Sequence, residues 1–162
     1  MSAVAPMSDL EKEVRPERRG HRFPRAARLL RHADFEAVYK QGRRHFSPSM
    51  TVFYWLRSKT EPPRPAISNS NLQPRVGLRI GFTVGRALGG AVQRNRMKRR
   101  LREAVRLTRP RIGPNADVVI NPKKSLLSAD FQAVVKEVER AFALIEQKCR
   151  TEVSESTQRL SS

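Results

Sequence analysis

Basic side chains are concentrated in one stretch in the second half of the chain. Between Arg86 and Arg111 there are ten Arg and Lys residues and a single acid, Glu103. Arginine suits phosphate binding because its planar guanidinium donates two parallel hydrogen bonds and stays charged at any biological pH. The whole chain has 33 Lys and Arg against 15 Asp and Glu, and a compact domain tolerates this net charge of +18 best beside a polyanion. The composition favours a nucleic-acid partner, although a run of charge is also typical of a solvated surface.

The densest part of this stretch has the period of an amphipathic helix over residues 91–108. One side of such a helix is apolar and carries Met97, Leu101, Ala104 and Val105. The opposite side is polar and basic and carries Asn95, Arg99, Arg102 and Arg106. The first turn of a helix also exposes backbone N–H groups that favour phosphate oxygens. On these grounds alone the helix would serve DNA, RNA or an acidic protein equally well.

Nothing in the sequence indicates a catalyst made of protein side chains. The histidines His21, His32 and His45 lack metal-binding spacing, and there is no nucleophile elbow or phosphate-cradling glycine loop. Cys149 is the single cysteine, which excludes a disulfide framework and fits a reducing cytoplasm. The apolar stretches are too short to cross a bilayer. We therefore expect no catalytic residue, no metal site, no organic cofactor, no membrane contact and a cytoplasmic location.

Hydrophobic periodicity predicts the order of the secondary-structure elements. They are a helix over 33–41, a strand over 50–56, a strand over 75–84, a helix over 91–108, a strand over 116–120 and a long helix capped by Ser128, with one further strand near 44–47. Gly42 follows the first helix, where a left-handed C-terminal cap is expected. This order predicts helices packed on a small mixed sheet.

The chain has the composition of a single domain with polar ends. Its 38% hydrophobic content suits one modest core, which we place in residues 25–150. Residues 1–24 contain too few large apolar side chains to bury, so we expect a flexible basic arm there. Residues 58–74 are rich in Pro, Asn and Ser and predict an exposed loop insertion. Residues 151–162 are expected to be a flexible tail.

One segment resembles the signature of the bacterial ribonuclease P protein family, Ala-Val-x-Arg-Asn-Arg-x-Lys-Arg. In this chain it reads Ala91-Val92-Gln93-Arg94-Asn95-Arg96-Met97-Lys98-Arg99. The resemblance covers about residues 29–145 and includes Asp34-Phe35, Gly42-Arg43-Arg44, Val52-Phe53-Tyr54, Arg75-Val76-Gly77 and Asp117-Val118-Val119-Ile120. The chain departs from the family at Gly85-Arg86-Ala87, where Ser-Lys-Lys is usual, and at Gly90, where Lys is common.

The resemblance implies both a fold and an activity. The fold is an α/β (α+β) two-layer sandwich with a mixed sheet of about four strands, three helices and a left-handed crossover at the signature helix, although handedness rules alone favour a right-handed one. The activity is that of a ribonuclease P subunit, in which a catalytic RNA with bound Mg²⁺ ions removes the 5′ leader of precursor tRNA. The implied partners are the ribonuclease P RNA subunit and precursor tRNA, and no obligate protein partner is evident.

The resemblance also divides the functional residues between two surfaces. The signature helix would contact the catalytic RNA through Arg94, Asn95, Arg96, Lys98, Arg99 and Arg102, with a role in bracing the fold as the alternative for some of them. A cleft between the first helix and the sheet would hold the single-stranded 5′ leader through Phe35, Tyr39, Tyr54 and Arg86. Aromatic faces bind unpaired bases by stacking, worth about 1–3 kcal/mol per base. For Phe35 a purely structural place in the core is an equally good interpretation.

Two other functions stay open on the sequence. A general RNA-binding or ribosomal protein would explain the charge and the basic helix, but not the extent of the resemblance. A DNA-binding regulator could place residues 95–106 in a major groove, but it lacks an evident helix-turn-helix partner.

Overall fold

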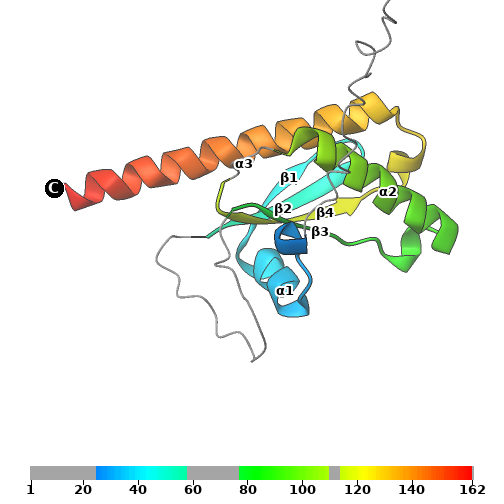
Figure 1. Ribbon diagram of the computed structural model, residues 1–162, viewed down its shortest axis with the longest axis horizontal. Coiled ribbons are helices and arrows are strands. Elements are labelled where there is room, and N and C mark those ends of the chain that lie inside the picture. The colour runs from blue at the N-terminus through cyan, green and yellow to red at the C-terminus, as the bar shows by residue number, and fades with distance from the viewer. Residues whose placement is uncertain (1–24, 58–76, 110–113, 162) are drawn as a thin grey trace, which may run out of the picture.

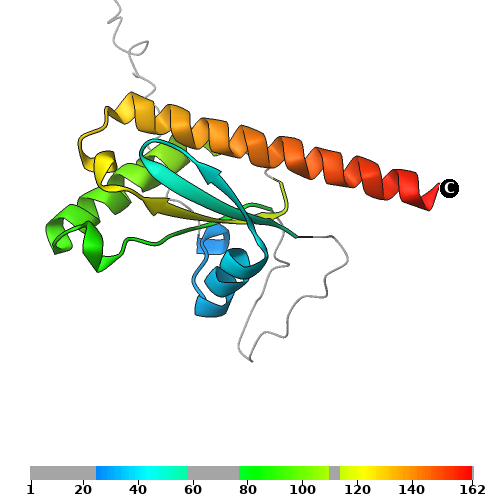
Figure 2. The same ribbon diagram turned by 180° about the vertical axis from the view of Figure 1, so that it is seen from behind.

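The computed structural model describes residues 25–57, 77–109 and 114–161. The arm predicted over residues 1–24 and the loop predicted over residues 58–74 lie outside these ranges. The described residues form one mixed sheet with helices on both of its faces (Figures 1 and 2).

Within the described ranges, four strands and three α-helices follow the predicted order, and three short 3-10 helices, which were not predicted, accompany them. The strands are β1 (Arg43–Phe46), β2 (Met50–Leu56), β3 (Arg79–Phe82) and β4 (Ala116–Pro122). The helices are α1 (His32–Gln41), α2 (Ala91–Thr108) and α3 (Phe131–Leu160), and the 3-10 helices are η1 (Arg25–Ala27), η2 (Arg86–Leu88) and η3 (Lys124–Leu127). The strand predicted over 75–84 is shorter than expected, and its first two residues lie outside the described ranges.

The sheet has the strand order β1-β2-β4-β3. Strands β1 and β2, and β2 and β4, pair antiparallel, whereas β3 and β4 pair parallel. Helix α2 connects the parallel pair, so the structure confirms a small mixed sheet with a crossover at the signature helix. The left-handed sense of that crossover stays a prediction of the resemblance.

The sheet and the α2–α3 pair form the two main layers, and the short α1 lies on the opposite face (Figures 1 and 2). The main core fills the space between the sheet and α2–α3, and all four residues predicted for the apolar side of α2 are fully buried in it. A smaller cluster on the α1 side is built around Leu29, Val38 and Val119. Because adjacent strand residues point to opposite faces, the two clusters use alternate positions of the same strands.

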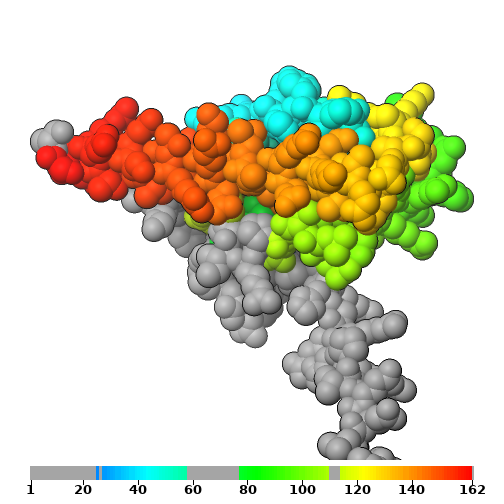
Figure 3. Space-filling view, turned by 90° about the horizontal axis from the view of Figure 1, so that it is seen from above, coloured from blue at the N-terminus to red at the C-terminus, as the bar shows by residue number. Residues whose placement is uncertain are grey.

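Helix α3 differs from its predicted bounds at both ends. Its N-cap is Asp130, and Ser128 instead follows η3 as its C-cap. The helix continues to Leu160, past the expected domain boundary at Arg150, and its last turns project beyond the sheet (Figures 1 and 3). Residues 147–160 contain no Gly or Pro, and extending an anchored helix costs far less than starting one. An ion pair of 2.9 Å between Arg43 of β1 and Glu152 also links this extension to the sheet.

Gly42 does not form the predicted left-handed cap. Its φ is −79° and its ψ 164°, an extended conformation open to any residue. The need for glycine is steric instead, because a Cβ atom here would overlap the Val38 carbonyl oxygen and lie 2.8 Å from that of Tyr54. Gly42 is therefore the point where the end of α1 contacts the backbone of β2.

This contact predicts a marked cost for Gly42→Ala. We expect the free energy of unfolding to fall by about 1–3 kcal/mol, because backbone atoms must move to admit a methyl group. Gly85→Ala is the matched control: Gly85 has a φ of −71° and open space around its Cβ position. That control should be neutral or stabilising by about 0.4–1 kcal/mol. Urea unfolding of both variants tests the pair, and equal losses would contradict the steric explanation.

Candidate nucleic-acid interface

The solvent-facing side of α2 carries the cations that the sequence assigns to it. Asn95, Arg96, Arg99 and Arg102 are exposed, and we call these four residues the basic side of α2. The other two predicted RNA-contacting residues, Arg94 and Lys98, are half-buried at its flank. The Nε atom of Arg94 is buried without a hydrogen-bond partner among the described residues.

Two other arginines of α2 already have protein partners. Arg100 donates hydrogen bonds to the carbonyl oxygens of Leu126 (2.6 Å) and Leu127 (2.9 Å) and also to that of Ala129. It therefore braces η3 and the start of α3 against α2. Residues 98–100 are all cations. Nothing in the local sequence shows that Arg100 braces η3 whereas Arg99 is exposed to solvent.

Arg106 is paired with the one acid of this stretch. Its Nε donates to Glu103 Oε2 at 2.9 Å. This hydrogen bond from Arg106 lowers the pKa of Glu103, so the acid is ionised at neutral pH and offsets the charge of Arg106. The free positive charge on the surface of α2 therefore lies in its first three turns, on the basic side defined above.

The first turn of α2 is also suited to an anion. It contains no acidic residue, and its N-cap is Gly90. Gln93 Oε1 accepts a hydrogen bond of 3.0 Å from the Gly90 N–H. Helix dipoles favour negative charge at this end, so the arginines and the backbone attract phosphate in the same place.

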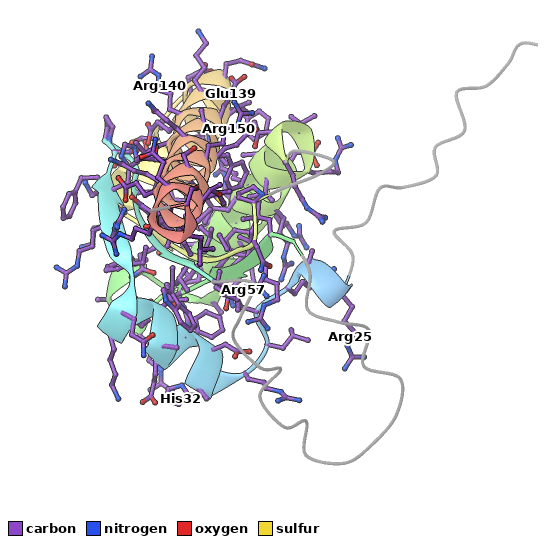
Figure 4. The ribbon with its side chains drawn as sticks, turned by 90° about the vertical axis from the view of Figure 1, so that its left-hand side faces the viewer. Arg25, His32, Arg57, Glu139, Arg140 and Arg150 are labelled. Atoms are coloured by element: carbon purple, nitrogen blue, oxygen red, sulfur yellow. The ribbon has the colours of Figure 1, made fainter. Side chains whose placement is uncertain are left out.

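On the other face of the sheet, a buried ion cluster fixes α1 in place. Arg79 of β3 donates to both carboxylate oxygens of Asp117 of β4, at 2.8 Å and 2.5 Å, and lies 3.3 Å from Asp34 of α1. Arg57 approaches Asp117 at 3.1 Å. Figure 4 shows Arg57 among the interior side chains, whereas Arg140 points outward. The sequence alone does not reveal this cluster, because its members are far apart in the chain.

Arg79 keeps its charge even though it is buried. Arg79, Asp34 and Asp117 are at most 7% exposed. Burial by itself would lower the pKa of Arg79, but hydrogen bonds and charge attraction from Asp117 and then from Asp34 outweigh it, so the pKa is raised above its ordinary value. The guanidinium therefore joins two strands and a helix through charge-assisted hydrogen bonds.

One row of residues, which lie side by side across the four strands, is not covered by helix α1. The register places Phe46 of β1 opposite Thr51 of β2, and Thr51 opposite Asn121 of β4. Thr83, which follows β3, continues this row through a backbone hydrogen bond of 3.1 Å to Ile120. We call Phe46, Thr51, Asn121 and Thr83 the open row, because Phe46 and Thr83 are exposed and the other two are half-buried.

Two of the predicted leader-binding residues project from α1 toward this region. The Tyr39 hydroxyl lies 2.9 Å from Thr83 Oγ1 and 3.0 Å from Asn121 Oδ1, so it bridges two members of the open row. Phe35 is partly buried over Gly81, where a Cβ atom would lie 2.5 Å from the Phe35 ring. Phe35 is thus packed into the α1-side cluster. Arg86 is exposed on η2, three residues beyond Thr83.

The prediction that Tyr54 lines the leader-binding cleft is wrong. Tyr54 is 3% exposed and belongs to the main core with Met50 and Val52, on the face that α2 and α3 cover. Phe53 points to the α1 side instead and meets the Tyr39 ring edge-on, with 4.9 Å between ring centres. The missed signal was the alternation of the strand, because a core position at Met50 and Val52 puts Phe53 on the opposite face.

The structure therefore defines a small α+β protein with a basic helix on one side and a polar and aromatic sheet face, partly open, on the other. The sequence matches the Ribonuclease P family over residues 23–146, and the chain belongs to this family. The ribonuclease P protein component of Chloroflexus aurantiacus is 38% identical over 126 residues, 77% of this chain and 79% of the relative. That of Symbiobacterium thermophilum is 36% identical over 118 residues, 73% and 90% of the two chains.

Solved structures agree with the fold. The ribonuclease P protein of Thermotoga maritima superposes with a TM-score of 0.55 at 24% identity, covering 71% of this chain and 94% of that one. The Staphylococcus aureus protein gives 0.56 at 20% identity, covering 74% and 95%. Membership of the family makes the chain the protein component of an endoribonuclease that processes tRNA, and implies an RNA subunit as its partner.

Within the described ranges there is no group of three His, Cys, Asp or Glu side chains that could hold a metal ion. No helix in the described part of the chain combines the length and the apolarity that crossing a membrane requires.

The ion cluster generates a stability prediction. Asp117→Asn leaves the buried Arg79 without its main counter-charge, so we expect the free energy of unfolding to fall by about 3–5 kcal/mol. Glu139→Gln, which removes an exposed carboxylate from α3 (Figure 4), should change it by no more than about 0.5 kcal/mol. Chemical denaturation of both variants provides the measurement. A loss for Asp117→Asn no larger than that of the control would show that the cluster does not hold the fold together.

Proposed function

We propose that this chain binds the ribonuclease P RNA through the basic side of α2 and the 5′ leader of precursor tRNA on the α1 side of the sheet. In this way it assists the endonucleolytic removal of the leader that gives the mature 5′ end. The observation that carries the proposal is the separation of two complementary surfaces. One is a row of exposed cations on a rigid helix, and the other is an open row beside Tyr39 and Phe53.

The two surfaces differ in chemistry, as their proposed ligands do. A folded RNA presents phosphates in a fixed arrangement, which suits arginines on a helix whose apolar side is locked in the core. A single-stranded leader exposes bases and 2′-hydroxyl groups, which suit aromatic rings and neutral hydrogen-bonding side chains such as Thr51 and Asn121. Leader sequences vary between precursors, so contacts that tolerate any base are the useful kind.

Catalysis is assigned to the RNA partner. We propose that Mg²⁺ enters the holoenzyme with the RNA. The protein would contribute binding energy for the leader and for the RNA subunit, and no catalytic side chain. We place this reaction in the cytoplasm, as expected from the composition.

The DNA-binding alternative receives no support from the element order. A helix-turn-helix needs a second helix joined by a short turn, whereas α2 is preceded by β3 and the three-residue η2. A general RNA-binding role agrees with the basic side of α2, but not with membership of the ribonuclease P family.

Reconstitution is the direct test of the proposal. The full chain should increase the rate of 5′-leader removal by ribonuclease P RNA at low Mg²⁺ concentration, because repulsion between the phosphates of the two RNAs is then least screened and the protein's cations matter most. Bovine serum albumin at the same concentration controls for non-specific protein effects. A rate that does not change over the range in which the protein binds the RNA would refute the proposal.

Salt dependence tests the basic side of α2. Replacement of Arg96, Arg99 or Arg102 by Ala should weaken binding to ribonuclease P RNA and reduce the slope of log K against log salt by roughly one for each phosphate that the variant no longer binds. Arg140→Ala is the matched control for total charge, because Arg140 is an exposed arginine on α3. It should alter the slope much less than the α2 variants do. Arg100→Ala should mainly reduce stability, since Arg100 braces η3. Equal slope changes for Arg140 and Arg99 would mean that only net charge matters.

Leader length tests the α1 side. Tyr39→Ala should weaken the binding of precursor tRNA by up to roughly 1–3 kcal/mol while leaving the affinity for mature tRNA unchanged, because only the precursor has bases to stack. Tyr39→Phe keeps the ring and removes only the hydroxyl group that bonds to Thr83 and Asn121, so it should retain most of the affinity. Equilibrium binding to the reconstituted holoenzyme measures both. Equal losses for precursor and mature tRNA would remove the leader assignment.

A further inference from the structure

Strand β1 forms one edge of the sheet and exposes an aromatic ring at its end. Phe46 is 68% exposed and is a member of the open row. Arg44, two residues earlier, pairs with Phe53 in the register and is also exposed, so Arg44, Phe46 and Phe53 lie on the same face. This face is the one that carries α1 and Tyr39.

Phe53 is already in contact with other side chains of this face. The Tyr39 ring meets it edge-on, at an interplanar angle of 77°. The Arg44 guanidinium lies over the Phe53 ring, with its carbon 5.4 Å from the ring centre. Such a cation–π contact orients the guanidinium plane and leaves its outer side toward solvent. The stacking surfaces offered outward from Phe53 are therefore the guanidinium of Arg44 and the ring of Phe46.

We propose that Arg44 and Phe46 form a second contact for the single-stranded 5′ leader, at the β1 edge and outward from Tyr39 and Phe53. The inference rests on the proposed leader-binding function and extends it to a defined subsite. Arginine planes and aromatic rings are the two kinds of side chain on which unpaired RNA bases stack. Arg44 also supplies a charge for the backbone phosphates.

The open row gives the leader a direction. Its β3 end, at Thr83, is three residues from Arg86 and is followed along the chain by the first turn of α2, where the catalytic RNA is proposed to bind. Its other end is Phe46 at the β1 edge. A leader that leaves the cleavage site on the RNA would meet the Tyr39 region first and reach Phe46 last. Phe46 and Arg44 would then contact nucleotides farther from the cleaved bond.

A second copy of the chain fits this edge less well. Pairing of two β1 strands would bring Arg43 and Arg44 of both copies together, and like charges across a strand pair are destabilising. Charged edge strands commonly prevent such pairing. The same charges attract a polyanion, so single-stranded RNA is the occupant that the charge pattern favours.

The test is a leader-length series with the full chain in the reconstituted holoenzyme. Precursor tRNAs whose leaders grow one nucleotide at a time are titrated against the parent protein, Phe46→Ala, Phe46→Tyr and Tyr39→Ala. Phe46→Ala should match the parent for short leaders and bind longer ones at least about fivefold more weakly, the loss of one base stack. Its defect should begin at a longer leader than that of Tyr39→Ala. Phe46→Tyr should restore the affinity.

Two further variants sharpen the test. Arg44→Lys keeps the charge and removes the stacking plane, so it should show the same length-dependent loss in part. Val153→Ala removes a similarly exposed apolar side chain, 54% exposed, from α3 and should behave like the parent at every leader length. Thermal unfolding of each variant checks that the fold is kept, as expected for exposed positions.

The outcomes separate this inference from the function on which it rests. If Tyr39→Ala shows a leader-dependent loss and Phe46→Ala none at any length, the second contact is refuted and the leader site stands. If neither variant depends on the leader, the proposed function itself fails. Analytical ultracentrifugation checks self-association. If Phe46→Ala lowers the molecular mass of the protein in solution and causes no leader-dependent loss of affinity, the β1 edge is a self-association surface and the inference is overturned.

Discussion

The arrangement of this protein depends on one buried guanidinium. Arg79 joins β3 to β4 through Asp117 and to α1 through Asp34, all within 3.3 Å. A buried charge is tolerated only while its partners stay in position, so the cluster ties α1 to the sheet more strictly than apolar contacts would. The cluster therefore fixes one point of contact between α1 and the sheet, at Arg79 and Asp117. The open row, at Thr83 and Asn121, lies four residues farther along β3 and β4 and is not covered by α1.

The three rows of the α1-side face illustrate this division. The row at Arg79 and Asp117 holds α1 by ion pairs, and the next, at Gly81 and Val119, receives the ring of Phe35. The third is the open row, which the Tyr39 hydroxyl of α1 reaches through hydrogen bonds to Thr83 and Asn121. The opposite face carries the main core over β2, β3 and β4, so it supplies the stability that lets the α1 side keep polar and exposed groups.

Local patterns in the sequence were sufficient wherever burial repeats along one element. The period of α2 gave its bounds and its buried side, and the apolar runs were enough to predict strands around 50–56 and 116–120. Contacts between distant residues were not accessible. Arg99 and Arg100 are the same residue type, and only the carbonyl groups 26 to 29 positions away make Arg100 a brace. Tyr54 was misplaced because two adjacent aromatics in a strand must face opposite ways, and composition does not say which is inside.

Charge along the α1-side face is distributed differently from what the family resemblance leads one to expect. Ala87 and Gly90 are exposed, so the lysines that the resemblance leads one to expect at these two positions are missing from the β3 end of the open row. Arg86 stays at that end, while Arg44 provides a cation at the β1 end, held in place by Phe53. Salt screens the interaction between exposed charges that are more than about 10 Å apart, so a cation attracts mainly the phosphate beside it. In the proposed leader path, Arg44 is therefore the cation that lies beside the outer part of the leader.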